Sequence, residues 1–169
     1  MSAHGRILLV EAEDDIRRLL AIALLRNGYQ VSAFASAEEF LTTDGLLRLL
    51  EFDLAIIDYK MGEMDGQELC LRIKAVRPEL PVIIESGMPG QVFTNDCLRA
   101  GASQVLTKPF SVGELLIAIR STLSSIEQAE TPAPSTSDSV VGAIAETVVE
   151  VVTSAAVEAV VDDITDSYE

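Results

Sequence analysis

Three side chains that suit phosphoryl chemistry, Asp58, Ser86 and Lys108, each follow a short strand candidate in this 169-residue chain. In an open α/β sheet, ligands bind outside the carboxyl ends of the strands, so side chains at several strand ends share one site. A carboxylate, a hydroxyl and an ammonium in one site make a nucleophile, a hydrogen-bond donor and a cation. The sequence therefore predicts a phosphoryl site at this edge of a sheet.

In residues 1–128, short apolar segments alternate with longer helical patterns. The apolar segments are the strand candidates whose ends position Asp58, Ser86 and Lys108. Capping-box patterns begin two of the predicted helices, at Ser36 and Ser111, and Asn27-Gly28 ends the first helix. Five βα units in about 120 residues predict an α/β fold with a parallel sheet and helices on both faces. The strands are expected at 6–10, 29–34, 53–57, 82–85 and 103–107, and the intervening helices at 16–26, 36–50, 66–77, 91–100 and 111–126.

Short motifs at these strand ends resemble the receiver domain of bacterial two-component response regulators over about residues 5–125. Each motif is weak alone, but they occur together and in order. The resemblance implies a doubly wound, flavodoxin-like sheet of order 2-1-3-4-5, and phosphorylation of Asp58 by a histidine kinase or a phosphotransfer protein. The matching motifs are Ile7-Leu8-Leu9-Val10-Glu11, Asp58 with Met61, Met64-Asp65-Gly66, Ser86-Gly87, Gly101-Ala102 and Thr107-Lys108-Pro109-Phe110.

The same resemblance implies a Mg²⁺ ion bound by Asp58, by Glu11 and by the backbone carbonyl of Lys60. Lys108 would pair with a phosphoryl oxygen, and the Ser86 hydroxyl would donate to another. Receivers typically carry two acids directly after the first strand, and here that pair is Glu11 and Ala12. Because Ala12 offers no ligand oxygen and Mg²⁺ affinity depends on ligand charge and number, we expect weak Mg²⁺ binding, with Glu11 acting directly or through water.

Two further departures concern the loop and the expected conformational switch. Gly62 stands where a proline is common, which loosens the loop after Asp58. Val105 stands where many receivers carry a switch aromatic. Val105 and Ala12 leave open a pseudo-receiver, an interaction scaffold whose Mg²⁺-dependent phosphorylation is impaired.

Simpler interpretations of the same residues stay open. Asp58 alone would be a strand-terminating carboxylate, Ser86 a turn residue and Lys108 the start of a loop. Glu11 would be an ordinary solvated acid. The following acids Asp14 and Asp15 are most simply first-turn residues that interact with a helix dipole.

Composition narrows the class of function. The net charge is −15, of which residues 121–169 contribute −10 without a single base. The lack of a basic patch argues against direct nucleic-acid binding. No secretory signal or membrane-length apolar stretch is found, and the two isolated cysteines suit a reducing compartment, so we expect a cytoplasmic location and no membrane partner.

The last forty residues have a composition of their own. Residues 129–139 form a linker rich in Pro, Ser and Thr, and residues 140–169 form an acidic tail rich in Val and Ala. An apolar face and an acidic face within 140–164 predict an amphipathic helix that self-associates or docks on a partner. A disordered tail is the alternative, since valine is a mediocre helix former.

These observations favour a stand-alone receiver, which is not an enzyme, over the pseudo-receiver. We expect it to be phosphorylated on Asp58 and to signal through contacts with a downstream protein that the sequence does not name. A metal-dependent phosphohydrolase is a weaker alternative, because the sequence offers no additional metal ligands or general base.

Overall fold

The computed structural model describes residues 4–42, 44–88 and 90–129. Within them, five parallel strands form one sheet in the order β2-β1-β3-β4-β5, which confirms the predicted topology. The strands are β1 (Arg6–Val10), β2 (Gln30–Phe34), β3 (Leu54–Asp58), β4 (Val82–Ser86) and β5 (Gln104–Thr107). The helices are α1 (Asp14–Arg26), α2 (Ala37–Thr42), the 3₁₀ helix η1 (Leu47–Glu51), α3 (Gly66–Val76), α4 (Gln91–Arg99) and α5 (Val112–Ala129).

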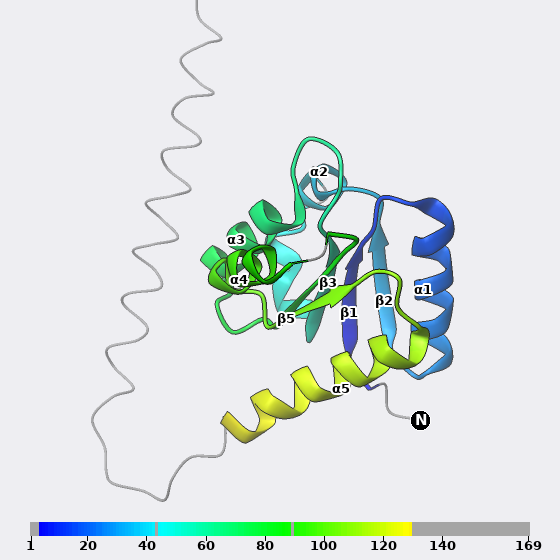
Figure 1. Cartoon of the computed structure of the whole chain (residues 1–169). Coiled ribbons are helices and arrows are strands. Elements are labelled where there is room, and N and C mark those ends of the chain that lie inside the picture. Colours follow the sequence, from blue (N-terminus) through cyan, green and yellow to red (C-terminus); the bar gives the residue numbers. More distant parts are fainter. Residues whose placement is uncertain (1–3, 43, 89, 130–169) are drawn as a thin grey trace, which may run out of the picture. The chain divides into compact units, whose positions relative to one another are not determined.

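Helices cover both faces of the sheet, with α1 and α5 on one face and α2, α3 and α4 on the other (Figure 1). Strand residues alternate between the two cores: Ile57 and Ile84 pack with α3 and α4, whereas Ile56 and Ile83 pack with α1 and α5. Because β3 is apolar on both faces and lies in the middle of the sheet, it is fully buried along its length. Its last residue, Asp58, is therefore carried to the carboxyl edge on a rigid element.

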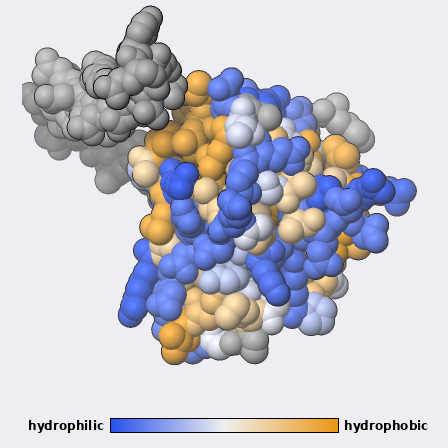
Figure 2. Space-filling view, turned by 90° about the horizontal axis from the view of Figure 1, so that it is seen from above, coloured by the Kyte–Doolittle hydropathy of each residue, from blue (hydrophilic) through white to orange (hydrophobic). Residues whose placement is uncertain are grey.

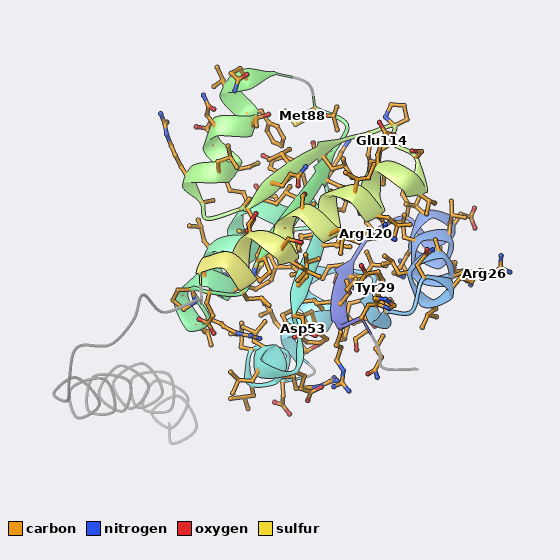
Figure 3. The ribbon with its side chains drawn as sticks, turned by 90° about the horizontal axis from the view of Figure 1, so that it is seen from below. Arg26, Tyr29, Asp53, Met88, Glu114 and Arg120 are labelled. Atoms are coloured by element: carbon orange, nitrogen blue, oxygen red, sulfur yellow. The ribbon has the colours of Figure 1, made fainter. Side chains whose placement is uncertain are left out.

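Capping side chains fix where the helices around this edge begin. In α5, the Ser111 hydroxyl accepts from the Glu114 amide at 3.2 Å, and the Glu114 carboxylate accepts from the Ser111 amide at 2.7 Å. This is the predicted capping box. Figure 3, which is seen from the side opposite to that of Figure 2, shows Glu114 and Arg120 along α5.

The second helix is shorter than predicted. We expected it to run to about Leu50, but α2 ends at Thr42 and a separate 3₁₀ helix follows at Leu47. Asp44 has a φ of +57°, a left-handed conformation that an α-helix does not accommodate. The Thr42 hydroxyl also donates to the carbonyls of the preceding turn, which competes with continuation of the helix.

The linker at 129–139, apart from Ala129, and the amphipathic helix at 140–164 lie outside the described residues. None of the described helices is long and apolar enough to cross a membrane.

Candidate phosphoryl-transfer site

The carboxyl edge of the sheet brings together the residues that the sequence singled out. Asp58 ends β3, and Ser86 ends the neighbouring β4. Glu11 directly follows β1, and Lys108 directly follows β5. Glu11, Asp58 and Ser86 are buried, so the interpretation of Glu11 as a solvated surface acid is wrong.

The Lys108 ammonium bridges two of these carboxylates. Its Nζ lies 2.8 Å from Oε2 of Glu11 and 3.1 Å from Oδ1 of Asp58. The Lys108 backbone amide also donates to the Ser86 carbonyl at 2.8 Å, which holds the start of its loop against β4. The lysine therefore faces the carboxylate that would carry a phosphoryl group, although another acid also holds it.

Burial and charge shift the acidity of these groups. Burial raises the pKa of Asp58, as does the neighbouring charge of Glu11, while Lys108 opposes the rise. For Lys108, burial lowers the pKa, but the hydrogen bond to Glu11 and the surrounding acids outweigh it, so the pKa of this ammonium is raised overall. Lys108 is therefore a fixed positive charge at neutral pH.

The other expected site residues lie around Asp58. The Ser86 oxygen accepts a hydrogen bond from the Met88 amide at 3.0 Å, which leaves its own proton free to be donated. The Lys60 amide lies 3.4 Å from Oδ1 of Asp58, a long hydrogen bond, and the Lys60 side chain is exposed. Lys60 thus meets Asp58 through its backbone amide, and the role of its carbonyl as a metal ligand stays a prediction.

The start of α3 packs tightly against the backbone of Asp58. A Cβ atom added to Gly66 would lie 2.5 Å from the Asp58 carbonyl oxygen, and the Gly66 amide donates to the Tyr59 carbonyl at 2.9 Å. Only glycine allows this approach. The preceding Asp65 caps α3 by accepting from the Glu68 amide.

The residues expected to bind Mg²⁺ supply the right atoms in an incomplete arrangement. Glu11 and Asp58 offer carboxylate oxygens, the ligands that Mg²⁺ prefers, but Lys108 holds both, and Ala12 is exposed and has no ligand atom. Among the described residues, no three His, Cys, Asp or Glu side chains converge closely enough to hold a metal ion as they lie. A cation would have to displace Lys108 from at least one carboxylate.

One buried acid in this region was missed by the sequence analysis as a site residue. Glu85, which pairs with Asp58 across β3 and β4, has no exposed surface, and neither carboxylate oxygen has a hydrogen-bond donor. Burial raises its pKa to about 8, with Lys108 opposing and Glu11 adding to the rise. Its carboxyl lies near that of Glu11, where a hydrogen bond between the two acids requires a proton on one of them. The signal was one acid in an otherwise apolar strand.

An apolar pocket of about 390 Å³ opens beside Lys108. It lies between α1 and the loop that leads from β5 into α5. Figure 2, in which the molecule of Figure 1 is seen from above, shows a mainly hydrophilic surface interrupted by apolar patches. The pocket is lined by Ile16, Leu19, Leu20, Lys108, Pro109, Phe110 and Val112.

Comparisons with known proteins agree with this geometry. Response regulator receiver protein CpdR from Brucella abortus is 36% identical over 114 residues, which are 66% of this chain and 90% of CpdR. Transcriptional regulatory protein AfsQ1 from Streptomyces coelicolor is 32% identical over 85% of this chain, and the match spans only 62% of AfsQ1.

The fold has close counterparts among solved structures. A CheY-like response regulator receiver domain protein from Methanospirillum hungatei matches with a TM-score of 0.66 and 29% identity, over 76% of this chain and 99% of that one. Residues 7–120 match the family described as the response regulator receiver domain. This chain therefore belongs to the response regulator receiver family.

Proposed function

We propose that Asp58 is the phosphoacceptor of a stand-alone receiver, that a histidine kinase or phosphotransfer protein phosphorylates it, and that the chain signals through protein contacts. The observation that carries the proposal is the position of Lys108, whose ammonium lies 3.1 Å from Asp58 Oδ1 at the end of a rigid, buried strand. The stand-alone arrangement is supported by the 90% coverage of CpdR. A reducing, cytoplasmic setting is supported by two buried, free cysteines.

The residues around Asp58 have distinct tasks in the transfer. An Asp58 oxygen attacks phosphorus, the bond from phosphorus to the donor's histidine nitrogen breaks, and that nitrogen keeps the electron pair. Lys108 moves from Asp58 Oδ1 to a phosphoryl oxygen, and the Ser86 hydroxyl donates to a second one. Glu11, Asp58 and the Lys60 carbonyl would hold a Mg²⁺ ion of modest affinity. When bound, that ion neutralises charge on the phosphoryl oxygens.

The apolar pocket beside Lys108 is our proposed contact for the phosphodonor protein. Leu19 is 60% exposed at its rim, although apolar side chains gain by burial. Docking an apolar helix face there would place the donor's phosphohistidine next to Lys108 and Asp58. Leu19→Asp should then slow transfer from a phosphotransfer protein but not from acetyl phosphate. Leu25→Asp, an equally exposed leucine further along α1, is the matched control.

The output surface is proposed on α4, β5 and α5, the face that the family commonly uses. The exposed apolar side chains there include Val92 and Leu98 on α4 and Ile117 on α5. The Tyr59 ring, next to the phosphoacceptor, meets Phe93 of α4 edge to face, with centroids 4.6 Å apart. Val105 supplies no switch aromatic, so the phosphorylation signal needs another route from Asp58 to α4. The contact between Tyr59 and Phe93 offers one.

Phosphorylation is tested directly by incubation with acetyl phosphate in Mg²⁺, followed by intact-protein mass measurement. The wild-type chain should gain one acid-stable, base-labile phosphoryl group, and Asp58→Asn should gain none. Asp53→Asn, just before the start of the same strand, should label like the wild type. Labelling that persists in Asp58→Asn would refute the assignment.

The alternative is a pseudo-receiver, and Ala12 together with the double ion pair of Lys108 favours it. In that case neither acetyl phosphate nor a phosphotransfer protein labels the wild-type chain, whereas Ala12→Asp restores labelling. The same incubation therefore separates the two functions.

A further inference from the structure

Glu85 is an acidic residue that follows three apolar residues on β4. The residues before it on β4, including Ile83 and Ile84, are fully buried, and so is Glu85. A buried carboxylate is costly unless a cation or hydrogen-bond donors compensate it. Both of its oxygens lack a donor in the structure, so the site around Glu85 is chemically incomplete.

Its surroundings identify what is missing. Glu85 lies opposite Asp58 in the sheet register and acts electrostatically on Lys108, Glu11 and Asp58. The carboxyl groups of Glu11, Asp58 and Glu85 therefore interact with one another, and Lys108 is the ammonium that interacts with all three. A divalent cation would add two positive charges and would take the unpartnered oxygens of Glu85 as ligands.

Ala12 suggests which role the Glu85 carboxylate has, because position 12 lacks a carboxylate. Receivers typically place two acids after the first strand, and this chain keeps only Glu11 there. We propose that Glu85 is an oxygen donor to the coordination shell of a divalent cation in the Asp58 pocket, supplying from β4 the carboxylate that is missing at position 12. This inference rests on the cation site of the proposed function but not on phosphorylation itself.

Cation binding in this form requires two movements of side chains. The Lys108 ammonium must leave Glu11 or Asp58, since it now bridges them. The Glu85 carboxyl, whose pKa burial raises to about 8, must lose its proton and turn toward the vacated position. Mg²⁺ keeps several waters when proteins bind it, so Glu85 acts on the ion or on one of its waters.

The test is cation binding to unphosphorylated protein, without any phosphodonor. Mn²⁺ affinity is measured by electron paramagnetic resonance, and Mg²⁺ affinity by NMR titration of backbone amides. Glu85→Gln, which keeps the shape of the side chain, and Glu85→Ile, which matches its neighbours on β4, should each weaken both ions by about tenfold or more. Glu63→Gln removes a carboxylate from an exposed residue in the loop after β3 and should change affinity by less than about twofold.

The combination Ala12→Asp with Glu85→Gln separates a missing ligand from a damaged fold. It should bind Mn²⁺ at least as tightly as the wild-type chain, because the acid returns to its usual position. Unchanged or tighter binding by both single Glu85 variants would overturn the proposal, leaving Glu85 as a neutral acid that shares a proton with Glu11. Failure of phosphorylation with intact, Glu85-dependent cation binding would overturn only the proposed function.

Discussion

The ion pair between Lys108 and Glu11 joins the loop after β5 to the end of β1 across two intervening strands, with Nζ 2.8 Å from Oε2 of a carboxylate that has no exposed surface. This distance is shorter than the 3.1 Å from the same Nζ to Asp58. In the unphosphorylated state, the lysine is thus held by a residue that is not the phosphoacceptor. Phosphoryl transfer must break or lengthen the ion pair between Lys108 and Glu11. Lys108 therefore affects both the stability of the fold and the phosphorylation of Asp58.

Removal of the Lys108 ammonium should therefore lower the free energy of unfolding. Lys108→Ala leaves buried acids without their cation, and breaking such a buried pair costs on the order of 3–5 kcal/mol. We expect a loss of about 2–4 kcal/mol in urea unfolding in chelator, because the Lys108 side chain is partly exposed. Saturating Mg²⁺ should recover part of it, as a ligand that binds only the folded state does. Lys60→Ala, an exposed lysine near the site, should be neutral.

Gly66 should tolerate no side chain. In Gly66→Ala the new Cβ would meet the Asp58 carbonyl oxygen at 2.5 Å, so the backbone of the phosphoacceptor or of α3 must shift. We expect a stability loss of about 1–3 kcal/mol and slower phosphorylation by acetyl phosphate. Gly62→Ala is the control, since nothing lies within 4 Å of its Cβ position. Equal behaviour of the two variants would contradict the packing argument.

Much of this arrangement could be predicted from the sequence, because it depends on local patterns that the fold preserves. The apolar period gave the strand positions to within one or two residues, and the Ser111–Glu114 capping box marked the start of α5. The predicted length of the second helix was wrong. The end of α2 depends on the left-handed conformation of Asp44, which the spacing of apolar residues does not indicate.

Two features of the site depended on tertiary structure. The burial of Glu11 follows from its neighbours across the sheet, and a list of strand ends does not reveal it. The apolar pattern of the sequence marks Glu85 only as the last residue of its predicted strand. Its relation to Asp58 appears once the β3–β4 register is known.

Glu85 should make the stability of the metal-free chain depend on pH. Its folded pKa of about 8 lies above the ordinary value of 4.5 for an unfolded chain, so the folded state binds more protons between those values. The contribution of protonated Glu85 to the free energy of unfolding is fully present below the unfolded pKa of 4.5. It is lost as the pH rises through the folded pKa of about 8. Glu85→Ile removes this loss, so its advantage over the wild type should widen from pH 5 to pH 8.5.

The size of that advantage can be measured in chelator by urea unfolding at several pH values. Replacing a buried charge with a well-packed apolar residue is often stabilising by about 1–4 kcal/mol, and we expect a gain in that range at the highest pH. Added Mg²⁺ should reduce the gap, because only the wild-type chain uses Glu85 for the ion. A gap that shrinks as pH rises would contradict the raised pKa.

Cation affinity and fold stability should change in opposite directions in Ala12→Asp. The new carboxylate adds a ligand oxygen, so Mg²⁺ should bind more tightly and acetyl phosphate should label Asp58 faster. Without Mg²⁺, the same charge joins Glu11 and Asp58, and the like charges should lower the free energy of unfolding. An NMR titration that gives equal Mg²⁺ affinity for the two proteins would refute the account of Ala12.

Phe93 should carry the phosphorylation signal to α4 without affecting the chemistry. The Tyr59–Phe93 edge contact is lost in Phe93→Leu, which keeps an apolar side chain of adequate size. Phosphorylation of Asp58 should proceed at the wild-type rate, whereas the phosphorylation-dependent NMR shifts of the α4 amides should become smaller. Phe40→Leu disrupts the comparable edge contact between Phe34 and Phe40, whose second ring lies on α2, and should leave the α4 shifts intact. If α4 responds fully in Phe93→Leu, the signal reaches it by another path, and the contact with Tyr59 is only packing.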